Sequence, residues 1–122
     1  MSQSNQWQTI CQTSDLIPHS GIAAWTERGP VAIFWRPGCE PELSAIGHFD
    51  PIARADVLAR GIVGDVDGEP VVASPLYKQH FSLRTGECLE EEARVPVFPV
   101  RTEGNQVQLS LRDSASESAS AA

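Results

Sequence analysis

The chain has 122 residues and a mass of 13.2 kDa, which corresponds to about one domain with one modest hydrophobic core. Its 9 Lys and Arg residues stand against 16 Asp and Glu residues, a formal net charge of −7, which argues against nucleic acid and anionic membranes as partners. No stretch approaches the ~18 apolar residues of a membrane-spanning helix. The N-terminus lacks the basic and apolar regions of a signal peptide, so a cytoplasmic location is expected.

Short apolar runs separated by turn residues predict an all-β chain. In chain order, the expected strands are residues 7–11, 22–26, 31–36, 43–49, 62–66, 70–74, 80–83, 95–101 and 106–111. Residues 31–36 are apolar on both faces, which is typical of a strand between two layers. Asp67-Gly68 predicts a tight hairpin turn, and residues 50–61 predict a loop with one helical turn. This pattern favours a small sandwich or barrel.

The last ten residues differ from the rest in composition. Residues 113–122 contain no apolar side chain larger than alanine, which predicts a disordered Ser/Ala-rich tail. We therefore expect residues 1–112 to form the domain.

Residues that could hold a metal or cofactor are scattered. The three cysteines and three histidines are Cys11, Cys39, Cys88, His19, His48 and His80. They lack the short pair spacings of zinc sites, and no glycine-rich nucleotide loop occurs. No metal or cofactor is therefore expected on this chain. The acidic run over residues 87–92 indicates a solvated face, with docking on a basic partner patch as the alternative.

Residues 73–86 combine aromatic, basic and proline residues more densely than a structural hairpin needs. This segment resembles Rieske [2Fe–2S] domains, which carry C-x-H in one loop and C-x-x-H in a second, followed by F-x-L-x-T-G. Here the first loop is Asp50-Pro51-Ile52, the second is residues 74–77, and residues 81–86 read FSLRTG. The resemblance implies a Rieske-like antiparallel β-sandwich or small barrel, with a loop subdomain in place of the cluster-binding subdomain.

The ligands of that family are missing. Where the Rieske pattern has Cys, His, Cys and His, this chain has Asp50, Ile52, Ser74 and Tyr77. Isoleucine cannot ligate, and oxygen donors are a poor exchange for thiolates on iron. We therefore expect no cluster.

The chain as a whole is similar to the small subunits of assimilatory NAD(P)H-dependent nitrite reductase. The matching phrases are GHFDP (47–51), VLARGIVGD (57–65), SPLYKQHFSLRTGECLE (74–90) and VPVFPVR (95–101). The resemblance implies a cytoplasmic enzyme that reduces nitrite to ammonium in nitrate assimilation. It implies that the large subunit carries FAD, a [4Fe–4S] cluster and sirohaem. The present chain is then an accessory subunit with no catalytic residue and no activity in isolation.

The two degenerate cluster loops are the expected docking surface for the large subunit. The residues predicted to contact it are Asp50, Pro51, Pro75, Tyr77, Lys78, Gln79 and His80. Tyr77 is expected to be an aromatic anchor, and the alternative is that it fills the empty cluster cavity. Two rival functions stay open: a binding or regulatory module for another oxidoreductase, and a ferredoxin-type electron carrier.

Overall fold

A computed structural model describes residues 7–112, and over this range β-strands are joined by turns, with two 3₁₀ turns, η2 (Thr13–Asp15) and η3 (Leu58–Arg60). The strands are β1 (Gln8–Gln12), β2 (Ser20–Thr26), β3 (Gly29–Trp35), β4 (Leu43–Gly47), β5 (Phe49–Asp50), β6 (Ala55–Asp56), β7 (Ile62–Val66), β8 (Glu69–Ala73), β9 (His80–Ser82), β10 (Val97–Phe98), β11 (Val100–Glu103) and β12 (Gln106–Leu109). The predicted all-β fold class is confirmed.

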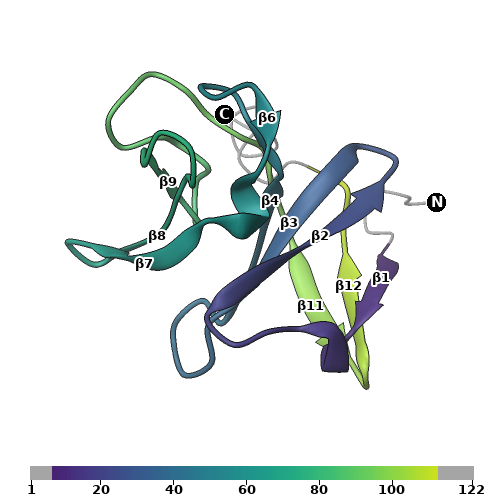
Figure 1. Cartoon of the computed structure of the whole chain (residues 1–122). Helices are drawn as coiled ribbons and strands as arrows, with labels where there is room; N and C mark the ends of the chain where they lie inside the picture. Colours follow the sequence, from purple (N-terminus) through teal and green to yellow (C-terminus); the bar gives the residue numbers. More distant parts are fainter. Residues whose placement is uncertain (1–6, 113–122) are drawn as a thin grey trace, which may run out of the picture.

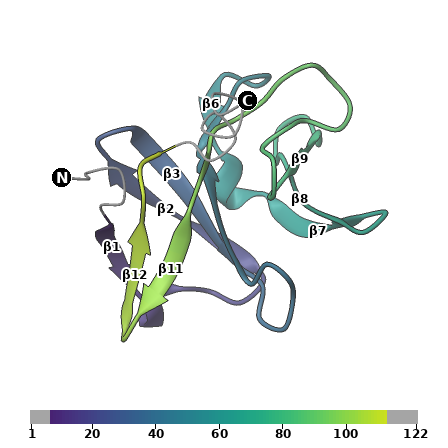
Figure 2. The same cartoon turned by 180° about the vertical axis from the view of Figure 1, so that it is seen from behind.

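The strands form a two-sheet base and a smaller subdomain (Figures 1 and 2). The base consists of the sheets β1-β12-β11 and β10-β4-β3-β2. The subdomain, residues 49–96, contains the hairpin β5-β6 and the sheet β7-β8-β9. All named strand pairs are antiparallel. The subdomain therefore has a small sheet of its own, formed by the strands expected at residues 62–66, 70–74 and 80–83.

Strand β3 lies between two hydrophobic cores. Val31 and Ile33 face the core of the base, and Ala32 and Phe34 face the core shared with the subdomain. All four side chains are buried, because successive residues of a strand point to opposite faces. The prediction of a strand between two layers is confirmed.

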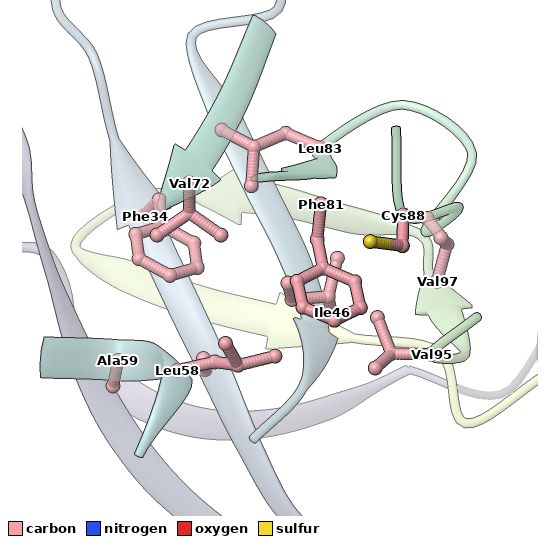
Figure 3. Packing of buried hydrophobic residues seen from close by; sticks show 11 residues of the cluster. Phe34, Ile46, Leu58, Ala59, Val72, Phe81, Leu83, Cys88, Val95 and Val97 are labelled. Carbon is pink, nitrogen blue, oxygen red and sulfur yellow. The ribbon is translucent and has the colours of Figure 1, made fainter. Parts of the chain in front are cut away.

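The second core joins the subdomain to the base (Figure 3). Its larger buried members come from β3, β4, η3, β8, β9, the turn after β9, the segment before β10 and β10 itself: Phe34, Ile46, Leu58, Val72, Phe81, Leu83, Val95 and Val97. Full burial of such a side chain contributes roughly 1.5–3 kcal/mol. Apolar burial thus fixes how the subdomain sits on the base.

Two strand predictions are wrong. Residues 43–49 are not one strand, because β4 ends at Gly47 and pairs with β3 and β10, whereas β5 begins at Phe49 and pairs with β6. Residues 95–101 are not one strand, because β10 pairs with β4 whereas β11 pairs with β12 in the other sheet. Pro99 lies between them and has no N–H to donate to a strand ladder. The chain therefore crosses from one sheet to the other at this proline.

Two further sequence predictions concern membrane-spanning helices and the C-terminal tail. Between residues 7 and 112, no helix has the length and apolar character that crossing a bilayer requires. The predicted tail, residues 113–122, lies outside the described range, so the domain boundary at residue 112 stays a prediction.

Candidate functional site

The first loop of interest, residues 50–54, begins where β5 ends; we call it the first tip loop. Its backbone closes when Arg54 N–H donates to the Asp50 carbonyl oxygen at 2.7 Å. The Asp50 Oδ1 atom accepts from the N–H groups of Ile52 at 2.9 Å and Ala53 at 3.1 Å. Aspartate often organises a turn in this way, by accepting from the backbone that follows it.

The second tip loop, residues 74–78, connects β8 to β9 and is built on the same plan. Lys78 N–H donates to the Ser74 carbonyl oxygen at 3.0 Å, and Leu76 N–H approaches Ser74 Oγ at 3.4 Å. The loop base is closed from the other side by Ser74 N–H, which donates to the Gln79 carbonyl oxygen at 2.8 Å. Each tip loop is therefore a five-residue turn organised by its first side chain.

A single side-chain hydrogen bond joins the two tip loops. The Ser74 hydroxyl donates to Asp50 Oδ2 at 2.5 Å, and both residues have 0% of their surface exposed. Hydrogen bonds to an ionised group are stronger than neutral ones, and burial removes the competing water. Asp50 and Ser74 thus form a buried polar cross-link at the tip of the subdomain.

The four positions that correspond to Rieske ligands do not fit a [2Fe–2S] cluster. The oxygens of Asp50 are already taken up by protein donors, and Ile52 packs against the second core. Tyr77 is 60% exposed, so its side chain lies largely in solvent. A Rieske cluster needs two thiolates and two imidazoles. Within residues 7–112, no three His, Cys, Asp or Glu side chains are grouped as metal ligands would be.

Outward-facing side chains of the tip are apolar and basic. Phe49, Leu76 and Tyr77 are each about half exposed or more, at 49%, 52% and 60%. Arg54 and Lys78 are exposed beside them. Aromatic side chains and arginine are enriched at protein interfaces, and exposed single hydrophobics are otherwise unremarkable.

The residues predicted to contact a partner differ in how much of their surface is exposed. Tyr77 and Lys78 are exposed, and Gln79 and His80 are half-buried. Asp50 is a correction: it has no exposed surface with which to touch a partner, because its carboxylate faces the tip loops' own donors. Its role is to hold both loops in place.

The acidic run lies against the second tip loop. His80 contacts Glu90 twice, through its backbone N–H at 2.8 Å and its ring Nδ1 at 2.6 Å. The Gln79 amide donates to Glu91 at 3.2 Å. Burial on its own raises the pKa of Glu90, but the hydrogen bonds from His80 outweigh it and lower the pKa below its ordinary value. Part of the acidic run thus braces the tip.

His48 was not singled out from the sequence, yet it fixes η3. Its ring Nδ1 accepts from Ala59 N–H at 3.0 Å, and its carbonyl oxygen accepts from the N–H groups of Val57 and Leu58. Burial lowers the pKa of His48, with opposing effects from Asp56 and Arg60. The neutral ring is required, because a protonated Nδ1 cannot accept a hydrogen bond.

The F-x-L-x-T-G motif forms the turn after β9. Phe81 and Leu83 are buried in the second core, and Ser82 Oγ accepts from the backbone that follows. Gly86 has a φ of +79°, and a Cβ there would lie 2.1 Å from the Val95 carbonyl oxygen. Only glycine satisfies both conditions. This part of the resemblance is therefore structural.

Two hollows open on the described surface. One, of about 480 Å³, is lined by Glu87, Cys88, Glu91, Glu92, Ala93 and Arg94. The other, of about 450 Å³, lies on the base and is lined by Thr13, Ser14, Leu16, Trp35, Glu42, Leu43 and Thr102. Neither of these two hollows is lined by a residue of the tip loops.

Comparison with known proteins finds one domain family and several nitrite reductase subunits similar to this chain. Residues 6–110 match the Rieske-like [2Fe–2S] domain family. The nitrite reductase (NADH) small subunit of Salmonella typhimurium is 42% identical over 106 residues, which cover 86% of this chain and 97% of that subunit. The solved structure of the Escherichia coli protein NirD has a TM-score of 0.76 and 38% identity, and covers 85% of this chain and 94% of its own. A nitrite reductase NAD(P)H large subunit of Klebsiella oxytoca is 39% identical over 105 residues, which are 85% of this chain and 11% of that subunit.

Proposed function

We propose that this chain, which belongs to the Rieske-like [2Fe–2S] domain family and within it to the small subunits of NAD(P)H-dependent nitrite reductase, is the accessory subunit that docks on the large subunit of that enzyme. One observation carries the proposal. The similarity extends over 97% of the Salmonella typhimurium small subunit, so it covers a complete small subunit and not only the fold.

The Klebsiella oxytoca relative supports the partner. There, a region similar to this chain makes up 11% of a nitrite reductase large subunit. A domain that is covalently part of the large subunit in one organism is expected to pack against it when supplied as a separate chain. In the separate chain, an interface has to replace the peptide link.

In this proposal the redox chemistry belongs to the large subunit. It holds FAD, a [4Fe–4S] cluster and sirohaem, and it reduces nitrite to ammonium in the cytoplasm during nitrate assimilation. The small subunit contributes no redox centre, because the positions of its family's ligands carry a carboxylate, an isoleucine, a hydroxyl and an exposed tyrosine. Its role is to bind and order the partner.

The docking surface in this proposal is the tip. Pro51, Pro75, Tyr77, Lys78, Gln79 and His80 contact the large subunit, and buried Asp50 positions the loops. Tyr77 acts as an anchor: the 60% exposure of its side chain supports docking and disfavours the alternative that it fills a cavity.

Reconstitution with the large subunit tests the function. We expect a tagged copy of this chain to co-elute with the large subunit encoded in the same genome, and to raise its NAD(P)H-dependent nitrite reduction. Separate elution together with unchanged activity would contradict the proposal.

The rival electron-carrier function has its own test. The purified chain is incubated with iron and sulfide under reducing, oxygen-free conditions and its visible spectrum is recorded. We expect no cluster absorption, whereas a stable [2Fe–2S] spectrum would favour the carrier.

A further inference from the structure

The two tip loops repeat one five-residue pattern. Residues 50–54 read DPIAR and residues 74–78 read SPLYK. In order, each loop has a fully buried polar residue, a proline, an aliphatic residue, a residue that differs between the loops, and a basic residue. Each closes with a hydrogen bond from the fifth N–H to the first carbonyl oxygen. Arg54 and Lys78 therefore occupy equivalent places on either side of the Asp50–Ser74 cross-link.

Both basic residues adopt a backbone conformation that favours glycine. Their φ angles are +60° for Arg54 and +66° for Lys78. A side chain in the left-handed region carries a steric cost that glycine avoids. His19 and Asp67 also have positive φ angles: His19 directly before β2, and Asp67 in an Asp-Gly hairpin turn, where this geometry is usual. The tip loops instead place long cations at their strained positions, and strain of this kind points to function.

The two charges are unpaired. Over residues 7–112, the side chains of Arg54 and Lys78 make no hydrogen bond or ion pair. By contrast, Arg28, Arg36 and Arg101 each donate to a backbone or side-chain oxygen.

The acidic run next to the second tip loop makes no ion pair with Lys78 in the part of the chain that the structure describes. Glu90 is engaged by His80, and Glu91 by Gln79. The ammonium group of Lys78 thus remains available to a partner.

From this geometry we propose that Arg54 and Lys78 bind carboxylate groups of the nitrite reductase large subunit, as a matched pair at the centre of the docking surface. The inference rests on the proposed function and adds the chemistry of the contact. Exposed Leu76 and Tyr77 precede Lys78 in the second tip loop, and in the proposed complex their apolar surface shields the Lys78 contact from water. The chain has a net charge of −7, so most of its surface repels an acidic patch on the partner. The two cations attract that patch and so orient the tip toward it.

Charge reversal tests the pair. The variants are the double change Arg54→Glu with Lys78→Glu, and the matched control Arg84→Glu, an exposed and unpaired arginine in the turn at the other end of β9. Dissociation constants for the large subunit are measured by titration of the purified proteins. We expect about tenfold weaker binding for each tip reversal and about 100-fold for the double variant, with the control unchanged.

Two further variants separate charge from folding. Arg54→Gly with Lys78→Gly relieves the positive-φ strain, so it is expected to keep or raise the melting temperature and still weaken binding by about tenfold or more. Arg54→Lys with Lys78→Arg conserves the charges and is expected to bind within about threefold of wild type.

Each outcome decides the proposal. Wild-type binding that is weakened by the tip reversals and not by Arg84→Glu supports it. If wild type and the tip reversals bind equally well, the cation pair is wrong and the proposed function stands. If the wild-type chain does not bind the large subunit at all, both fall.

Discussion

The base and the tip are held together by different forces. In the base, the sheets enclose an apolar core of Val31, Ile33, Ala45, Phe98 and Leu109, all nearly or fully buried. At the tip, the loops meet through the hydroxyl of Ser74 and the carboxylate of Asp50. Apolar burial is spread over many contacts, whereas the two tip loops are joined to each other by one buried side-chain hydrogen bond.

This difference bears on the proposal that the tip is a docking surface. In a Rieske domain the cluster joins two loops, so loops without a cluster need another cross-link to keep their shape. Here Asp50 and Ser74 supply it from the first residue of each loop, which leaves the later residues free to face outward. The tip can therefore be ordered and still present Tyr77 and Lys78 to a partner.

The largest expected effect lies in the base. Leu109→Ala empties part of a fully buried site and is expected to lower the free energy of unfolding by about 4 kcal/mol. The matched control is Leu76→Ala, the same change at a residue that is 52% exposed, with an expected loss of about 0.5 kcal/mol or less. Urea denaturation measures both. Equal losses of unfolding free energy in the two variants would contradict the claim that apolar burial stabilises the base but not the outer face of the tip.

The cross-link is expected to have the next largest effect. Asp50→Ala leaves the Ser74 hydroxyl and two backbone N–H groups without their acceptor, which costs about 3 kcal/mol, and Ser74→Ala costs about 1.5 kcal/mol. The double variant is expected to lose less than the sum, with a coupling of about 1–2 kcal/mol. Additive losses would show that the two residues do not act as one link.

A smaller effect is expected on binding at the tip. Tyr77→Ala is expected to weaken binding to the large subunit by about 2 kcal/mol, roughly 30-fold, while stability changes by about 0.5 kcal/mol or less because the side chain is exposed. Calorimetric titration measures the affinity for the large subunit, and thermal unfolding measures the stability of the chain. The reverse result, lower stability with unchanged affinity, would mean that Tyr77 serves packing.

The smallest effect is a pH dependence from His48. Burial lowers its pKa in the folded state below the ordinary value of 6.5, so the unfolded chain takes up the proton first as the pH falls. The contribution to stability is fully present above pH 6.5 and is lost as the pH drops through the folded pKa. Denaturation at several pH values between about 5 and about 8 is expected to show this slope, and His48→Gln to reduce it. An unchanged slope in the variant would assign it to other groups.

Much of the strand order in both the base and the subdomain could be predicted from the sequence, because its signals are local. Alternating apolar residues located the strands, and Asp67-Gly68 has the positive φ angles of 51° and 85° that its hairpin turn needs. The resemblance to Rieske domains located both tip loops. The error at residues 95–101 arose because a strand's partner sheet is a tertiary property, and Pro99 was a local signal that the run could break.

The chemistry of the tip was less accessible. Asp50 was predicted to be a contact because it lies in one of the two degenerate cluster loops, and only the folded arrangement shows Ser74 donating to it. The structural role of His48 was missed because the group that donates to its ring is the backbone N–H of Ala59, eleven residues further along the chain. Polar networks of this kind depend on contacts that no periodicity encodes.

Hydrogen–deuterium exchange of the chain, alone and with the large subunit, tests the central claim that the tip is the docking surface. The account predicts new protection of amides in residues 50–54 and 74–80, with exchange in β1, β11 and β12 unchanged. Protection confined to those base strands, or no new protection in a complex that has formed, would contradict it.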